Sequence, residues 1–170
     1  SRWYASEGMS NDGIDVDEKF YALEQTFDGG YIIAGSTNRL GWLLKTNFIG
    51  EPEWEYLHNG GGGNNHLTLN SVQPTSDGGV ITTGALYNLR YGLYDDTWND
   101  KDGLLIKVNG LGGLQWVKTF GFYSTDTSAF NSGYGIGQDF IHSVKETSDL
   151  GFILTGNTNS FDNEPFSLGY

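Results

Sequence analysis

The sequence contains no cysteine, which excludes disulfide bonds and any thiolate metal site or thiol nucleophile. Basic residues are also scarce: 9 lysines and arginines stand against 21 aspartates and glutamates, so the formal net charge is −12. Because a surface of that sign repels phosphate backbones, we do not expect nucleic acid as a partner. No run of 18 apolar residues is present to cross a bilayer as a helix, and we expect no membrane insertion.

Proline is rare as well, with 3 residues, whereas glycine is abundant at 26 and aromatic residues make up 15% of the chain. This composition is typical of a turn-rich, well-packed all-β protein and unlike that of a disordered chain. A chain of 170 residues is long enough to bury a core as a single domain.

An internal repeat organises the chain. Three segments align without gaps, at residues 20–35, 69–84 and 141–156, and each is predicted to form a strand, a tight turn and a second strand. The first two turns contain Asp-Gly-Gly, and Asp-Gly supplies the positive φ angles of a two-residue hairpin turn. Leu150 replaces the first of these glycines in the third segment, so we expect an altered turn there.

A second repeated segment follows two of these hairpins, at residues 42–54 and 104–116. An asparagine followed three residues later by glycine indicates a turn between two short strands. The repeating unit is therefore four short antiparallel strands. Lys45 and Lys107 occupy the same position in its third strand, which favours pairing with an acidic neighbour over a catalytic role.

The motif Thr-x-Asp-Gly-Gly-Tyr-Ile-x-x-Gly, followed by Leu-x-Lys-x-Asn-x-x-Gly-x-x-x-Trp, resembles the β-propeller repeats of many secreted and surface proteins of bacteria and archaea. It resembles more distantly the tryptophan-docking blades of quinoprotein propellers. The resemblance implies an all-β fold of about three propeller blades, each with four antiparallel strands, in an incomplete ring or as part of a larger propeller. With the acidic composition, it also implies an extracellular or cell-surface location.

The repeat suggests how the 170 residues divide into blades. We expect residues 18–59 and 67–122 to form one blade each, and residues 1–8 to form the fourth strand of a preceding blade. Residues 139–170 would supply two strands and the start of a third, because Leu168-Gly169-Tyr170 matches Leu40-Gly41-Trp42. Since a ring needs roughly four to eight blades, we expect the partners to be other blades of a longer chain or further copies of this chain.

Three tryptophans recur in the fourth strand: Trp3, Trp54 and Trp116. Aromatic residues line sugar and quinone sites, but the fixed strand position of these three favours docking of each blade on its neighbour.

The acidic loop at residues 95–103 is the strongest candidate for a ligand site. Ca²⁺ takes six to eight oxygen ligands, and this loop offers several over a short span. It does not match the helix-flanked calcium loop, which needs a glutamate at its twelfth position; a solvated acidic loop is the alternative. The candidate metal ligands are Asp95, Asp96, Asn99, Asp100 and Asp102.

No motif for a catalytic nucleophile is present, so we expect a non-catalytic module that acts as a scaffold, in adhesion, or in binding and assembly. Its ligand would be a glycan or a protein, and calcium would stabilise it. The alternative is a propeller enzyme, either a quinoprotein-type oxidoreductase or a carbohydrate-active enzyme. Its site would lie at the central channel, near Glu18, His66 and Asp139 at the ends of the first strands.

Overall fold

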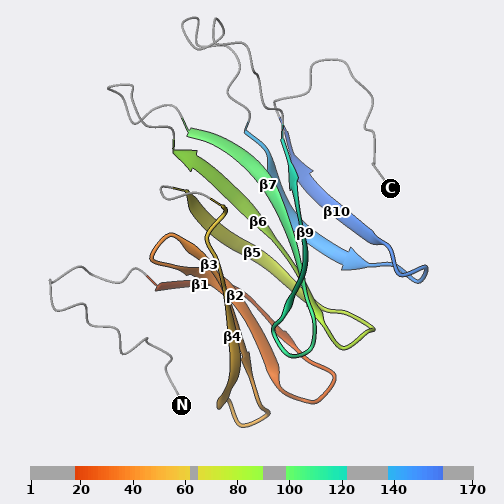
Figure 1. Ribbon diagram of the computed structural model, residues 1–170. Coiled ribbons are helices and arrows are strands. Elements are labelled where there is room, and N and C mark those ends of the chain that lie inside the picture. The colour runs from red at the N-terminus through yellow and green to blue at the C-terminus, as the bar shows by residue number, and fades with distance from the viewer. Residues whose placement is uncertain (1–17, 62–64, 90–98, 122–137, 159–170) are drawn as a thin grey trace, which may run out of the picture.

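The computed structural model describes residues 18–61, 65–89, 99–121 and 138–158. These residues form ten β-strands and no helix, which confirms the all-β class (Figure 1). Accordingly, none of the described residues belongs to a helix that could cross a membrane.

The strands form two four-stranded sheets and one two-stranded sheet, all antiparallel. Within each sheet, strands that are consecutive in the chain are neighbours. The first sheet contains β1 (Glu18–Gln25), β2 (Tyr31–Thr37), β3 (Leu40–Thr46) and β4 (Pro52–His58). The second contains β5 (His66–Pro74), β6 (Val80–Leu89), β7 (Asn99–Val108) and β8 (Leu114–Phe120), and the third contains β9 (Phe140–Glu146) and β10 (Phe152–Asn157).

The hairpin turns differ from the two-residue type predicted from Asp-Gly. In the β1–β2 turn, Gly29 N donates to Thr26 O at 2.9 Å and Thr26 N donates to Gly30 O at 2.9 Å, so three residues form the loop. Gly29 has a positive φ of 83°, and Asp28 does not belong to the positive-φ residues. This combination is a type I turn followed by a left-handed residue. The β3–β4, β5–β6, β7–β8 and β9–β10 turns have the same hydrogen bonds.

The altered turn expected at Leu150 is absent. Leu150 takes a φ of 66° and donates to Thr147 O at 3.0 Å, as the corresponding glycines do in the first two repeats. The hydrogen bonds of the hairpin therefore hold a leucine in a left-handed conformation that L-residues normally avoid.

A β-bulge interrupts the first strand of each sheet. The register shifts between Phe20 and Ala22 in β1 and between Leu69 and Ser71 in β5, and an equivalent shift occurs where β9 meets Gly156. A glycine lies opposite each bulge, because a side chain there would collide with the carbonyl of the bulged strand. This requirement explains the glycine that ends each aligned segment.

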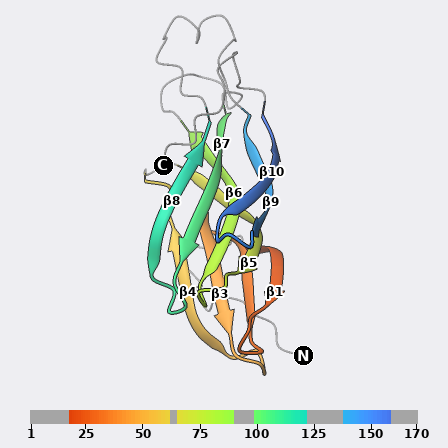
Figure 2. The same ribbon diagram turned by 90° about the vertical axis from the view of Figure 1, so that its right-hand side faces the viewer.

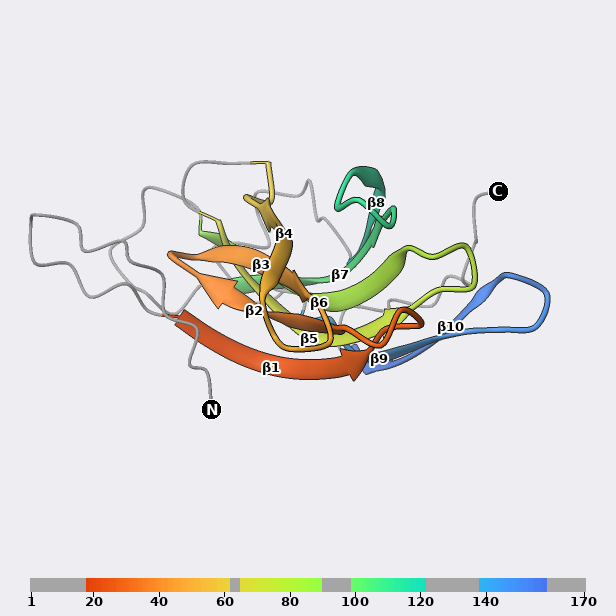
Figure 3. The ribbon, with the colours of Figure 1, turned by 90° about the horizontal axis from the view of Figure 1, so that it is seen from below.

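The three sheets stack on one another in chain order. β1, β2 and β3 pack against β5, and β5, β6 and β7 pack against β9 (Figure 2). Seen from below, the first strands β1, β5 and β9 lie along one side of the molecule, and β4 and β8 lie on the other side (Figure 3).

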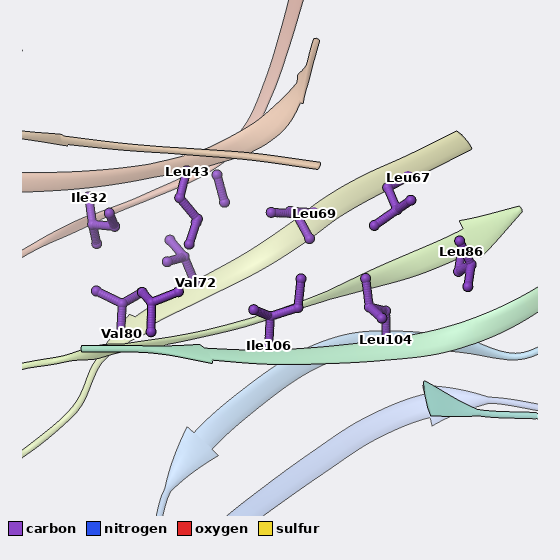
Figure 4. Packing of buried hydrophobic residues seen from close by; sticks show 11 residues of the cluster. Ile32, Leu43, Leu67, Leu69, Val72, Val80, Leu86, Leu104 and Ile106 are labelled. Carbon is purple, nitrogen blue, oxygen red and sulfur yellow. The ribbon is translucent and has the colours of Figure 1, made fainter. Parts of the chain in front are cut away.

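Each junction between sheets contains an apolar core. Between the first two sheets, Ile32 and Leu43 face residues of the second sheet such as Leu69 and Ile106 (Figure 4). On the other face of the second sheet, Ile81 and Leu105 pack with Val144 of β9. Alternate residues of β6 and β7 therefore serve two different cores, and this is why these strands are apolar on both faces.

Candidate functional site

A buried lysine ties together the strands of the first sheet. Lys45 Nζ donates to Asp28 Oδ2 at 2.8 Å and to Glu53 Oε2 at 2.7 Å, and to the carbonyl oxygen of Thr46 at 2.9 Å. Its side chain is 7% exposed, whereas that of Asp28 is 59% exposed. All three ammonium protons thus have acceptors, and two carboxylates balance the buried charge.

The second sheet repeats this arrangement with one acidic partner. Lys107 Nζ donates to both carboxylate oxygens of Asp77, at 3.0 and 2.9 Å, and to Gln115 Oε1 at 2.9 Å. Gln115 takes the place of Glu53, so the second lysine has only one carboxylate in contact. The predicted structural pairing of Lys45 and Lys107 with acidic neighbours is confirmed.

The turn aspartates are held in their ionised form. Hydrogen bonds from Lys45, from the Thr26 hydroxyl and from Gly30 N hold the pKa of Asp28 far below its usual value. For Asp77, the Thr75 hydroxyl contributes most, followed by Lys107 and Gly79 N, and the pKa falls to about 2. Burial lowers the pKa of Lys45, but its hydrogen bonds to Asp28 and Glu53 reverse the effect and the pKa is raised.

The third repeat has the aspartate without a lysine partner among the described residues. Asp149 accepts hydrogen bonds from the Thr147 hydroxyl at 2.5 Å and from Gly151 N at 3.3 Å, and these bonds lower its pKa. The turn is therefore built as in the first two sheets. β10 pairs only with β9 within the described part of the chain.

Trp54 reaches from the first sheet to the second. Its indole Nε1 donates to the carbonyl oxygen of Gly110 in the β7–β8 turn at 3.1 Å. A methyl group added to Gly112 in the same turn would lie 2.8 Å from the Trp54 ring, so the glycine makes room for the indole. The contact joins residues that are 56 positions apart in the sequence.

Trp116 extends from the second sheet toward the third. It packs against the core of Ile81, Leu105 and Val144, and its ring meets that of Phe152 edge-on at 5.9 Å between centroids. Lys118 also lies over the indole, with its Nζ 5.7 Å from the ring centroid. Trp54 and Trp116 thus occupy equivalent places at successive junctions, and Trp3 lies outside the described residues.

The calcium candidates are described only in part. Asp95 and Asp96 lie outside the described residues, and the backbone places Asn99 and Asp100 at the start of β7.

The side chain of Asp102 lies against Gly121 together with that of Asp139, which is 5% exposed. The sequence did not predict this neighbour, because 37 residues separate the two aspartates. Among the described residues, no group of three metal-ligating side chains is present, so calcium binding stays a prediction.

The residues proposed for a channel enzyme lie at corresponding ends of neighbouring strands. Glu18 begins β1, His66 begins β5, and Asp139 precedes β9. The His66 ring stacks on that of Tyr87 at 5.2 Å between centroids. These three residues occupy equivalent positions because each lies at the start of the first strand of a repeat.

One polar pair was not anticipated from the sequence. The Tyr56 hydroxyl and His58 Nδ1 are 2.9 Å apart on β4. Burial raises the pKa of Tyr56 and lowers that of His58. Their i, i+2 spacing on one face of a strand was the available signal.

No protein-family model matches the chain, and no curated protein sequence matches it. The functional interpretation therefore depends on the chain's own residues and contacts.

Proposed function

We propose that the chain is a non-catalytic β-propeller module that acts as a scaffold for binding or assembly, outside the cell or at its surface. The observation that carries this proposal is the repetition of one junction. β1, β2 and β3 contact β5 in the same way that β5, β6 and β7 contact β9. In a propeller, each blade packs its face on the next while the first strands surround the axis.

The tryptophan contacts support a docking role for the fourth strand. Trp54 binds the turn of the following sheet through a hydrogen bond and ring packing, and Trp116 packs on β10 of the third repeat. Each tryptophan therefore links one sheet to the next and contributes to a rigid scaffold. Loops on such a scaffold are free to vary and to bind a glycan or a protein.

Electron microscopy of the native polypeptide tests the architecture. We expect closed rings in which the first strands surround a central channel. An open stack of sheets would contradict the propeller. Light scattering on a size-exclusion column tests assembly from several copies, because a stable folded monomer of the 170-residue chain would exclude that variant.

Binding screens against glycan and protein arrays test the function itself. We expect a bound glycan or protein that is released unchanged. Turnover of a glycan, or recovery of a quinone with the purified protein, would instead favour the alternative of a channel-sited enzyme.

A further inference from the structure

The outer edge of β10 differs from the corresponding edges of β2 and β6. β2 pairs with β1 and β3, and β6 pairs with β5 and β7, whereas β10 pairs only with β9 among the described residues. Unpaired backbone groups along a strand edge form a template for another strand. Three residues around this edge identify the strand that fits it.

The first position is Asp149. Its turn has the same backbone hydrogen bonds as the turns of Asp28 and Asp77, and its carboxylate accepts from the same threonine and glycine positions. In the first two sheets, that carboxylate also accepts from a lysine of the third strand. In the third sheet, no basic side chain of the described residues contacts it. The geometry is therefore ready for an ammonium group.

The second position is Gly151. At the equivalent Gly30, an added methyl group would lie 2.7 Å from Lys45 Nζ and would collide with the carbonyl oxygen of Thr46. Gly79 is hindered in the same way by Lys107 and Val108. At Gly151, the nearest atoms are Thr147 Oγ1 at 3.1 Å and Asp149 Oδ1 at 3.3 Å, both in its own turn. The glycine leaves space where a third strand and its lysine lie in the other two sheets.

The third position is Trp116, on the preceding sheet. The equivalent Trp54 donates its indole proton to the carbonyl oxygen of Gly110, in the turn between the third and fourth strands of the next sheet. Trp116 Nε1 has no acceptor within the described part of the chain. An acceptor at the equivalent place would belong to the turn that follows a third strand on β10.

We propose that the edge of β10 binds a two-stranded hairpin of the β3–β4 and β7–β8 type, whose lysine pairs with Asp149 and whose glycine-containing turn accepts a hydrogen bond from Trp116. This inference rests on the proposed function, because it treats the third repeat as a unit of the same kind. Ile32 lies opposite Lys45 and Ile81 lies opposite Lys107, so the lysine of the bound strand lies opposite Ile153.

The chemistry of the bound hairpin restricts its source. Both hairpins of this type among the described residues already belong to complete sheets. A second copy of the chain would have to open one of its own sheets to donate a hairpin. None of the residues outside the described ranges is a lysine. The bound hairpin is therefore a further repeat segment with a lysine in its first strand and an Asn-x-x-Gly turn.

The test extends the full chain with such a hairpin. A copy of residues 105–120 is appended after Tyr170, because Tyr170 corresponds to Leu104 in the alignment of the repeats. The readouts are NMR amide exchange in β10 and exchange of the Trp116 indole proton. We expect exchange to slow at least tenfold for the β10 amides that point away from β9 and for the Trp116 indole.

Two matched controls separate specific pairing from general collapse. The first carries methionine in the appended copy at the position of Lys107, and the second is Asp149→Asn in the extended chain. Each is expected to lose most of the protection. Unprotected β10 amides in the extended chain would overturn the inference, and so would protection that both controls retain. The inference would also be overturned if the β10 amides that point away from β9 were already protected in the unextended chain, whether or not that protection depends on protein concentration.

The outcomes also separate this inference from the proposed function. Protection of β10 without ring formation by the native polypeptide would retain the hairpin site and contradict the propeller. Ring formation by the native polypeptide without protection of β10 in the extended chain would support the propeller and contradict the hairpin site.

Discussion

At the scale of the residue, the two buried lysines differ in the number of carboxylates that neutralise them. Lys45 contacts Asp28 and Glu53, whereas Lys107 contacts Asp77 and the neutral amide of Gln115. A buried charge that loses its only counter-ion is strongly destabilising. The repeat therefore contains an internal comparison of two otherwise similar sites.

Asp77→Asn is expected to destabilise the protein more than Asp28→Asn. We expect a loss of roughly 2–3 kcal/mol for Asp77→Asn, below the usual value for a buried pair because the aspartate is half exposed, and about 1 kcal/mol for Asp28→Asn, which leaves Glu53 in place. Urea unfolding measures both. The double variant Asp77→Asn with Lys107→Met is the control, since it removes the unpaired charge and should recover part of the loss. Equal effects of the two single variants would contradict this account.

The lowered aspartate pKa values predict how stability depends on acid. A carboxylate with a lower pKa in the folded state stabilises the fold above its unfolded pKa, near 4, and loses this effect as pH falls through the folded value. For Asp77 that window extends from about pH 4 to about pH 2. Chemical unfolding at a series of pH values should show a steep loss there, and a shallower one in Asp77→Asn. His58, whose pKa is lowered by burial from its usual value of 6.5, would destabilise the fold separately as pH falls below that value, because the unfolded chain then binds a proton that the buried ring does not. A profile that Asp77→Asn leaves unchanged would argue against the role of this carboxylate.

Leu150→Gly is expected to stabilise the protein. Leu150 has a φ of 66° and is 68% exposed, so the substitution relieves backbone strain and removes little packing. The strain is worth about 1–2 kcal/mol, from which the greater freedom of glycine in the unfolded chain subtracts about half, which leaves a gain of about 0.5–1 kcal/mol. Thermal unfolding measures the gain. Leu150→Ala retains Cβ and is expected to give none; an equal gain from alanine would show that the leucine side chain, and not the backbone, is the cause.

At the scale of the element, Trp54 connects β4 to the β7–β8 turn. Trp54→Ala removes a half-buried ring and a hydrogen bond, with an expected loss of about 2–3 kcal/mol. Trp54→Phe retains most of the packing and should lose only about 1 kcal/mol. The discriminating measurement is hydrogen exchange at Leu111 and Gly113 in the turn of the second sheet. Unchanged exchange there in Trp54→Ala would mean that the tryptophan acts only within its own sheet.

The strand pattern could be predicted from the repeats, but the turn type could not. Asp-Gly suits a two-residue turn, yet Thr26 and Gly30 close the hairpin one residue further out. The position of a closing pair depends on register along both strands, which a dipeptide does not determine. Leu150 shows the same limit, because the strands on either side override a local preference. The proximity of Asp102 and Asp139 is likewise a product of sheet stacking that no local pattern contains.

At the scale of the whole molecule, the predicted calcium site would act between sheets. Of the predicted ligands, Asp102 belongs to β7, and its side chain lies near that of Asp139, which precedes β9. An ion bound at Asp102 would therefore lie where the second and third sheets meet. We expect Ca²⁺ to raise the melting temperature by a few degrees and a chelator to reverse this, since a ligand that binds only the folded state stabilises it. Asp102→Asn should reduce the shift, and Mg²⁺ serves as the control ion. An identical melting curve with Ca²⁺ and with chelator would eliminate the site.

The stacking of consecutive sheets also determines how the molecule can come apart. Each junction has its own core, and the middle sheet shares one face with each neighbour. A molecule built in this way behaves as a one-dimensional series of coupled units, in which an end unit can detach while the others remain folded. Cooperativity is then a property of the junctions, and a ring, which has no ends, would unfold only by breaking two of them at once.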